Sequence, residues 1–485
     1  MQAQAVDFSR KWLVMGAVGM GIFLATLDGS IVNVALPTLV EELNTDFATL
    51  EWVVVGYLLT VCTLVLGVGR LGDMLGKKPI YAAGFLLFTL GSVLCGLASS
   101  VGWLIGFRVL QGVGASMVFG LGTAILTEAF PPAERGKALG ISGAVVSLGI
   151  VVGPTLGGLL IDLLSWNWIF FVNLPVGLLG TWMVLRHVPA FRPSARQEFD
   201  LPGAAFLCLG LLALLFGLSL GQRQGFGAPF VLALLGMSLV LLLLFIRIER
   251  RASQPMLDLG LMRRGQFSVN LLTGAITFLS IAGTLILMPF YLQNVLGHPP
   301  REVGLLLAVV PTTLAVVSPI AGSLSDRFGT RPMTVLGLLT LLGGYLALSG
   351  LRVDTTSREY LMRFLPVGIG MGLFQSPNNS AIMGAAPRHQ LGVASSLLAI
   401  TRLLGQISGI AVLGALWAGR VGHYGGGLLE GGASSAHPSA QVAALQETLL
   451  VIVILVGGAL LLSLWAYLRE KGNQRVVQPE DLHAA

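Results

Sequence analysis

The chain is a succession of long apolar runs separated by short polar or glycine- and proline-containing breaks. A membrane-spanning helix needs about 20 consecutive apolar residues, and fourteen such runs follow one another here. The predicted spans are 12–37, 50–70, 79–98, 103–128, 137–162, 166–187, 201–220, 229–247, 267–294, 303–323, 333–350, 360–385, 391–417 and 446–468. Only 11% of the residues are charged, too few to coat a water-facing surface. The pattern excludes an ordinary soluble enzyme, a nucleic-acid binder and a disordered scaffold, and it predicts an all-α polytopic membrane protein.

The basic residues predict how the chain crosses the membrane. With the N-terminus inside, 21 of the 29 Lys and Arg residues fall in inner connections and tails, and 6 fall in outer connections. Cytoplasmic loops carry an excess of these residues. We therefore predict a multi-pass protein of the cytoplasmic (inner) membrane with both termini in the cytoplasm. The one long outer connection, 418–445, is rich in Gly, Ala and Ser, which predicts a flexible loop; a partly inserted hairpin is the alternative.

One segment occurs twice. Residues 69–78 read G-R-L-G-D-M-L-G-K-K and residues 322–331 read G-S-L-S-D-R-F-G-T-R, with four identities and the basic pair Lys78/Arg331 at a constant offset of 253. Both copies lie in inner connections, eight predicted spans apart. Transporters are commonly built from two parallel halves related by an axis along the membrane normal. We therefore predict six-helix halves at 1–195 and 261–485, with two inserted helices in 196–260.

The repeated segment combines glycines, an acid and basic residues in a tight turn. Its members are Gly69, Asp73, Gly76, Lys77 and Lys78, with Asp326 as the counterpart of Asp73 in the second copy. Glycine permits close backbone approach and positive φ. Asp73 can lie at a helix N-terminus, where the macrodipole favours an anion, or pair with a basic neighbour. Such a cluster can latch one half against the other and act as a conformational gate. A plain cytoplasmic turn is the alternative interpretation.

Two charges are predicted deep in the membrane. Asp28 lies sixteen residues into the first span, roughly 24 Å from its inner end. An ionised carboxylate there should be protonated, paired or facing water, which suits a proton or substrate site; hydrogen bonding to Asn33 or to the backbone is the structural alternative. Arg108 lies at a compatible depth in the fourth span, and Gln111 follows on the same helix face. A purely structural ion pair is the alternative for Arg108.

Glycines recur every four residues in the fifth span. Gly149, Gly153 and Gly157 form one smooth helix face, with Gly158 beside it, and Pro154 can bend the helix. Small residues let helices pack closely in lipid. A tight, bendable seam suits the interface between the halves and limits leakage, although ordinary helix packing also explains such glycines.

A polar stretch interrupts the twelfth span. The sequence Q-S-P-N-N at 375–379 fits a helix that lines a cavity, because polar or broken helix in a membrane is tolerated there. The predicted substrate cavity therefore includes Asn33, Gln375, Asn378, Asn379 and the membrane cation Arg402. Aromatic residues such as Phe119 and Phe278 can add stacking or cation–π surfaces.

Catalytic and cofactor signals are missing from the sequence. It has no G-x-x-x-x-G-K-[ST] phosphate loop, so ATP is not the expected energy source. The three cysteines lie in apolar stretches and form no Cys-x-x-Cys or Cys/His cluster. We therefore expect no enzyme activity, no cofactor, no metal and no nucleic-acid partner.

Four segments carry a family resemblance. Residues 69–78 resemble the cytoplasmic loop signature of the major facilitator superfamily, with Gly72 where Ala is usual and Lys77 where Arg is usual. Three others resemble the fourteen-span drug:proton antiporter branch (EmrB/QacA type). They are L-D-G-S-I-V-N-V-A-L-P at 27–37, with Ser30 where Thr is usual, L-I-G-F-R-V-L-Q-G-V-G at 104–114, and the antiporter motif G-I-V-V-G-P-T-L-G-G at 149–158.

The resemblance implies a proton-coupled secondary transporter that exports lipophilic or amphipathic compounds by alternating access. Asp28 would carry or sense the proton, and Arg108 would tune the proton affinity of Asp28. The implied partners are a small amphipathic substrate, protons and membrane lipid, and the sequence does not indicate an accessory periplasmic adaptor. A pump for divalent cations should have several acids deep in the membrane, and Asp28 is the one acid predicted there. We therefore expect monocations, zwitterions or neutral amphipaths as substrates. A dedicated exporter of an endogenous metabolite or lipid, and a proton-coupled importer or facilitator, are the alternatives.

Overall fold

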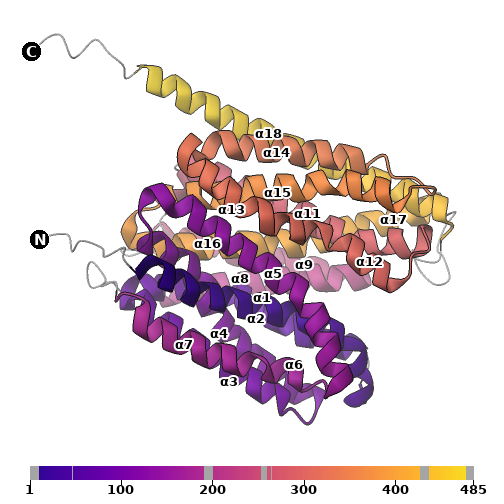
Figure 1. Ribbon diagram of the computed structural model, residues 1–485, viewed down its shortest axis with the longest axis horizontal. Helices are drawn as coiled ribbons and strands as arrows, with labels where there is room; N and C mark the ends of the chain where they lie inside the picture. Colours follow the sequence, from indigo (N-terminus) through magenta and orange to yellow (C-terminus); the bar gives the residue numbers. More distant parts are fainter. Residues whose placement is uncertain are drawn as a thin grey trace, which may run out of the picture.

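All regular structure in the described residues is helical. The computed structural model describes residues 10–45, 47–190, 200–252, 259–263, 265–425 and 436–476. The helices run roughly along one direction in a single bundle, and α1 begins at the same end of the bundle at which α18 ends (Figure 1).

The first group of helices spans residues 11–187. Its members are α1 (Lys11–Glu42), α2 (Phe47–Leu75), α3 (Lys77–Gly96), α4 (Val101–Ala129), α5 (Arg135–Leu163), α6 (Trp168–Phe171) and α7 (Asn173–His187), with the 3-10 turn η2 (Pro132–Glu134) before α5. Buried aromatic side chains such as Tyr81, Phe85 and Phe88 form part of its core. We call this group the first half.

The second group begins after two further helices, α8 (Leu201–Gln224) and α9 (Pro229–Glu249). Its members are α10 (Leu259–Arg263), α11 (Gly265–Phe290), α12 (Pro300–Leu307), α13 (Val309–Phe328), α14 (Thr330–Leu348), α15 (Ser357–Ala385), α16 (Leu391–Ser408), α17 (Gly414–Tyr424) and α18 (Pro438–Val476). The π-helical turns η3 (Tyr291–Val295) and η5 (Gly409–Leu413) and the 3-10 turn η4 (Arg388–Gln390) lie between them. We call α10–α18 the second half.

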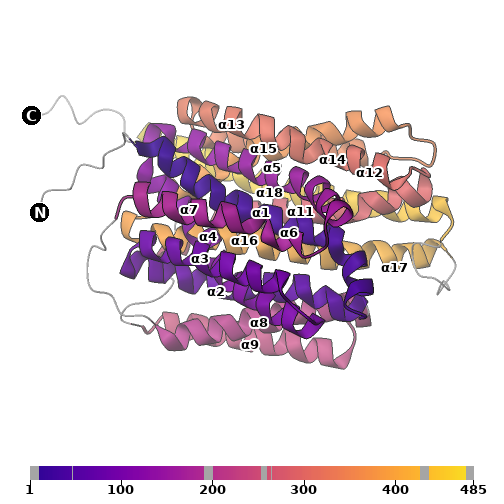
Figure 2. The same ribbon diagram turned by 60° about the horizontal axis from the view of Figure 1, so that its bottom comes forward.

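The two halves meet through a few helix pairs. Helix α5 of the first half packs against α13, and α2 and α4 pack against α16. Helices α8 and α9 form a hairpin at one edge of the bundle, where α8 contacts α2 and α16 (Figure 2). The arrangement agrees with two halves and an inserted pair. The predicted boundary between 195 and 196 lies outside the described residues, so the domain limits remain a prediction.

Thirteen of the described helical stretches are long and apolar enough to cross a membrane. The predicted twelfth span, 360–385, is the fully formed helix α15, which is not among the thirteen. Its polar stretch from Gln375 to Asn379 lowers its mean hydropathy. The count of fourteen spans therefore remains a prediction, whereas a multi-pass membrane protein agrees with the structure. Large exposed apolar side chains such as Leu185, Leu243 and Ile454 can face lipid.

The predicted outer loop 418–445 is wrong at both ends. Helix α17 continues to Tyr424 and α18 already begins at Pro438. Gly419 in α17 and the Ala-rich start of α18 suggested a loop by composition, but the packing of α17 against α18 stabilises helix there. Residues 426–435 lie outside the described part of the chain.

Candidate functional site

Polar side chains from three helices meet in the interior of the first half. Arg108 Nη1 of α4 lies 2.6 Å from Asp28 Oδ2 of α1. Gln111 Nε2 donates a hydrogen bond to Asp28 Oδ1 (2.8 Å), and Asn173 Nδ2 of α7 donates to the same oxygen (3.1 Å). All four side chains are at most 1% exposed. The structure thus brings the predicted residues Asp28, Arg108 and Gln111 into one buried network.

The guanidinium of Arg108 is held from every side. Its Nε donates to the carbonyl of Val53 (3.1 Å), and its Nη1 also donates to Gln111 Oε1 (2.7 Å). The ring of Tyr57 lies 4.3 Å from the guanidinium carbon. Burying an ion pair is favourable only when further hydrogen bonds satisfy both groups, as they do here. Changing the charge of either partner would leave the other charge buried and unbalanced.

Asn173 was missed by the sequence analysis. It begins α7, where a single amide near a predicted span end suggests a headgroup contact rather than a core position. The available signal was its apolar surroundings, since the flanking sequence F-F-V-N-L-P holds no other polar residue. Asn33, the alternative partner for Asp28, is exposed, and among the described residues it forms no hydrogen bond with Asp28. Ser30 on the same helix donates to the Gly149 carbonyl (2.9 Å).

The first copy of the repeat contacts the second half. The Asp73 carboxylate accepts hydrogen bonds from the backbone N–H groups of Gly392 (2.9 Å) and Val393 (3.0 Å), at the beginning of α16. Its own half supplies Lys77, whose Nζ lies 2.9 Å from Asp73 Oδ1 and 2.9 Å from Glu128 Oε1. Asp73 therefore both caps a helix of the other half and pairs with a lysine. Lys78 is half-exposed beside it.

The second copy contacts the first half in the same way. Asp326 accepts hydrogen bonds from the backbone N–H groups of Gly136 (2.8 Å) and Lys137 (2.9 Å), at the beginning of α5. An acidic side chain near a helix N-terminus satisfies free N–H groups and interacts favourably with the helix dipole. The two aspartates thus form a reciprocal pair of contacts between the halves.

The partners of the two aspartates carry a repeat of their own. Pro131, Gly136 and Ala138 match Pro387, Gly392 and Ala394, in a P-x-x-x-x-G-x-A pattern at an offset of 256. The sequence analysis overlooked this second repeat, which marks both receiving helix ends. Each is preceded by a short 3-10 turn.

Glycines allow the halves to approach closely at this end. A Cβ on Gly69 would overlap the Ser396 hydroxyl and the Gly392 carbonyl, and a Cβ on Gly322 would overlap the Gly136 carbonyl. Gly76 has a φ of 96° just before α3, and its repeat counterpart Gly329 has a φ of 87° just before α14. Both conformations favour glycine.

The antiporter-motif glycines lie elsewhere than expected. A Cβ on Gly149, Gly153 or Gly157 would meet Thr26, Ser30 or Ile31, all on α1 of the same half. The contact between α5 and the second half is made instead by Gly136, Gly140 and Gly143, which face α13. Pro154 is exposed, and a Cβ on Gly158 would find no atom within 4 Å. The expected inter-half seam is therefore displaced toward the start of α5, because the motif face of the helix is turned to α1.

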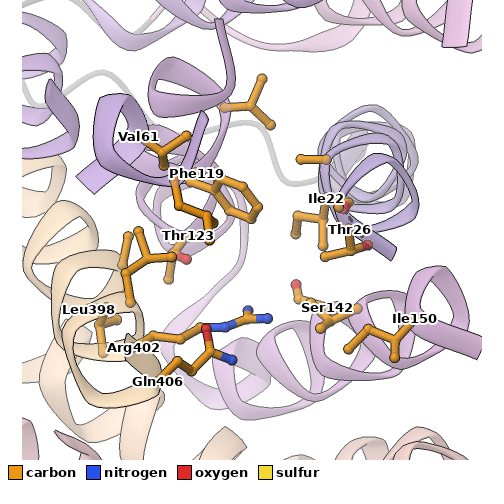
Figure 3. Close-up of a pocket in the computed structure, with 18 of the residues that line it drawn as sticks. Ile22, Thr26, Val61, Phe119, Thr123, Ser142, Ile150, Leu398, Arg402 and Gln406 are labelled. Atoms are coloured by element: carbon orange, nitrogen blue, oxygen red, sulfur yellow. Dashed lines mark hydrogen bonds between the residues drawn. The ribbon is translucent and has the colours of Figure 1, made fainter. Parts of the chain in front are cut away.

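A cavity of about 400 Å³ lies between the two halves. Its wall is formed by residues of α1, α2, α4, α5, α11, α15 and α16. Of the predicted cavity residues, Asn33, Gln375, Asn379 and Arg402 line it, as does Arg108. Asn378 does not; its Nδ2 donates to the Asn270 carbonyl (3.2 Å). Figure 3 shows Arg402 and Gln406 extending from α16 into this space, toward Ser142 of α5. The volume is typical of sites for small organic molecules.

The cavity and the buried Asp28 network share side chains. Within the described residues, no three His, Cys, Asp or Glu side chains are grouped so as to hold a metal ion. The cavity lining contains neither Asp nor Glu. The Asp28 network adjoins the cavity through Arg108 and Tyr57, which belong to both. A charge change at Asp28 can therefore reach the cavity through these two side chains.

Comparison with known proteins gives a consistent picture. Residues 18–410 match the family described as Major Facilitator Superfamily. The chain is 36% identical over 410 residues to the multidrug resistance protein Stp of Mycobacterium tuberculosis (strain CDC 1551 / Oshkosh), covering 84% of this chain and 76% of that protein. It is 32% identical over 412 residues to the riboflavin transporter RibZ of Clostridioides difficile (strain 630), covering 84% and 89%.

The fold is also similar to a solved structure. The human organic anion transporter MFSD10 (TETRAN) matches with a TM-score of 0.65 at 16% identity, over 92% of this chain and 99% of that one. At this identity the likeness concerns the fold alone. The sequence relatives and the helical architecture agree on a membrane transporter, and the chain belongs to the Major Facilitator Superfamily.

Proposed function

We propose that this chain is a proton-coupled exporter of lipophilic or amphipathic compounds, of the fourteen-span drug:proton antiporter branch. The observation that carries the proposal is the position of Arg108, which pairs with the buried Asp28 and also lines the cavity. A proton on Asp28 and a substrate in the cavity would both act on this one guanidinium. The proton gradient would supply the energy, so no cofactor is required.

The coupling follows from the charges of the network. While Asp28 is ionised, Arg108 is neutralised by its partner at 2.6 Å. Protonation of Asp28 removes that counter-charge, so that the guanidinium must find another acceptor or rearrange. Two ligands that bias the same two-state element are coupled reciprocally. In this proposal, binding of a proton at this network accompanies release of the substrate, and loss of the proton accompanies substrate binding, as antiport requires.

The reciprocal aspartate contacts supply the second element of alternating access. Asp73 and Asp326 hold the halves together at the end of the bundle where α2 and α13 end. Breaking these contacts would let that end open while the opposite end closes. We propose that this is the cytoplasmic end of a protein of the cytoplasmic membrane, and that both chain termini lie in the cytoplasm. We also propose that the six-helix halves are residues 1–195 and 261–485.

A second candidate function is a dedicated carrier of one metabolite. It is supported by the relative RibZ, whose name describes a riboflavin transporter. The name of Stp, a multidrug resistance protein, supports broad export. Growth protection against chemically unrelated toxic compounds would favour broad export, and protection against none would favour the dedicated carrier.

The proposal is tested in proteoliposomes under an imposed pH gradient. Lumenal pH is followed while ethidium, fluorescein and the neutral dye Nile red are added in turn. Substrate-dependent proton movement is expected for wild type and for Asp162→Asn, which alters an exposed carboxyl on α5, and not for Asp28→Asn. Dye movement without proton movement in every variant would contradict antiport and leave a facilitator.

A further inference from the structure

Within the part of the chain that the structure describes, Arg402 is a membrane cation without a polar partner. It lies eleven residues after the beginning of α16, which places it about 16 Å along the helix and near the middle of a 30 Å hydrocarbon layer. It has no hydrogen bond or ion pair with any residue that the structure describes. Its guanidinium carbon lies 5.8 Å from the centre of the Phe278 ring, which is a cation–π contact. Its side chain extends into the cavity (Figure 3).

The contrast with Arg108 defines the charge of the cavity. Arg108 lines the same space, but Asp28 neutralises it. No Asp or Glu is among the described residues that line the cavity, so none of them neutralises Arg402. The lining therefore presents one uncompensated positive charge. Charged groups inside membranes are costly and are generally paired or functional, so the missing counter-charge points to a ligand.

Polar side chains with unused hydrogen-bonding capacity line the same cavity as Arg402. Gln406 follows Arg402 by one helical turn and extends into the same space (Figure 3). Gln375 Oε1 and Ser395 Oγ are buried and have no hydrogen-bond partner within the described structure. Buried polar groups are otherwise nearly always satisfied. A ligand with an acidic group and a nearby hydroxyl or N–H would satisfy these atoms together with Arg402.

Much of the remaining wall is apolar. Phe119, Phe278, Leu398 and Leu403 face the cavity, together with aliphatic residues of α1 and α5. Aromatic and aliphatic walls of this kind accept the ring system of a small organic molecule, while a few placed polar groups fix its orientation. The cavity thus combines one uncompensated cation with a largely apolar wall.

We propose that the cavity binds amphipathic organic anions, whose acidic group pairs with Arg402 while the ring system lies against the apolar wall. This inference rests on the proposed function and names its substrate class. It differs from the expectation of monocations, zwitterions or neutral amphipaths, which followed from counting deep acids. The only such acid in the network, Asp28, is at most 1% exposed and already paired, so it offers no site for a cationic substrate.

Two dyes with the same ring frame and opposite charge test the proposal. Fluorescein is an anionic xanthene and rhodamine 123 a cationic one. Binding of each is measured by fluorescence anisotropy with the full chain in lipid nanodiscs, without any gradient. Wild type should bind fluorescein at least about tenfold more tightly than rhodamine 123, because a hydrogen bond to a charged group is worth that much or more.

Variants assign the preference to Arg402. Arg402→Gln should weaken fluorescein binding about tenfold or more and leave rhodamine 123 unchanged or tighter, whereas Arg402→Lys should keep most of the preference. Arg469→Gln, which removes an exposed arginine of α18, should bind as wild type does. If Arg402→Gln does not fold, the wild-type and Arg402→Lys measurements still decide. Fluorescein binding no tighter than rhodamine binding, or no binding of either dye, would overturn the proposal.

The two proposals fail in different ways. Proton-driven export of rhodamine 123 but not of fluorescein would keep the proposed antiport and overturn the anion site. Arg402-dependent fluorescein binding without proton-coupled movement of any dye would support the anion site and contradict antiport.

Discussion

Asp73 and Asp326 make the same contact in opposite directions across the interface between the halves. Each carboxylate accepts hydrogen bonds from two backbone N–H groups at the beginning of a helix in the other half. The donors are Gly392 and Val393 for Asp73. They are Gly136 and Lys137 for Asp326. The hydrogen bond of Ser376 Oγ to the Gly136 carbonyl reinforces the second contact. The state described here is therefore held closed at this end by a symmetric pair of helix caps.

Removing one cap should open this end. Asp73→Asn replaces one carboxylate oxygen by an NH2 group, which cannot accept the hydrogen bond from a backbone N–H. The loss of a hydrogen bond to a charged acceptor costs about 1.5–3 kcal/mol of stability. We expect the open population to rise at least about tenfold. Spin labels are placed at Lys78 and Arg327, on opposite halves at this end. Opening then lengthens the distance between the two labels, as measured by double electron–electron resonance. Asp354→Asn, an exposed acid outside the contact, is the control. An unchanged distance distribution in Asp73→Asn would refute the gating role.

Two glycines of the antiporter motif should respond differently to alanine. A Cβ on Gly153 would overlap the Ser30 hydroxyl, and Ser30 could not shift without disturbing its hydrogen bond to the Gly149 carbonyl. We expect Gly153→Ala to destabilise the α1–α5 contact by about 1–3 kcal/mol. Gly158→Ala meets open space and should match wild type. Thermal unfolding in detergent measures both, and equal melting temperatures would contradict the helix contact described here.

Asn173 should influence proton-coupled transport. It donates to the Asp28 carboxylate, so Asn173→Ala removes a hydrogen bond that holds this side chain in the buried network. A hydrogen bond to a charged group contributes about 1.5–3 kcal/mol, so the rate of substrate-driven proton movement in proteoliposomes should fall at least about tenfold. Ser92→Ala removes the other partner of Asn173 but keeps the donor to Asp28, and it should change the rate little. A rate that falls in Ser92→Ala and not in Asn173→Ala would argue against this assignment.

The charge of the substrate should be visible in the response to membrane potential. Export of an anion in exchange for a proton moves at least two positive charges inward per cycle, each worth about 2.3 kcal/mol per 100 mV. An inside-negative potassium diffusion potential should therefore accelerate fluorescein export strongly. Exchange of a monocation for a proton moves no net charge. Insensitivity of fluorescein export to the imposed potential would contradict export of the anionic form coupled to protons.

Much of this organisation could be predicted from local sequence. The apolar runs predict the helices, and the repeat at 69–78 and 322–331 locates both latch aspartates. Depth along two spans places Asp28 and Arg108 at compatible levels. These features depend on helix geometry and on the constant thickness of a bilayer, so they need no knowledge of packing.

The rest depends on tertiary contacts. Asp73 and its partner Gly392 are separated by 319 positions, and periodicity does not reveal which helix end faces which turn. The rotation of α5, which turns Gly153 to α1 and Gly140 to α13, is likewise set by packing. Asn173 was overlooked although its neighbours in the sequence are apolar, because the sequence does not show that this side chain meets Asp28. The unpaired state of Arg402 became apparent only from the residues that surround the cavity.

The central claim is that protonation of Asp28 couples the proton gradient to substrate movement. It is tested most directly by comparing two fluxes in proteoliposomes that hold Asp28→Asn, which mimics a permanently protonated side chain. The account predicts that exchange of labelled for unlabelled fluorescein across the membrane continues, while pH-driven accumulation against a concentration gradient is lost. Accumulation at the wild-type level in Asp28→Asn would contradict it.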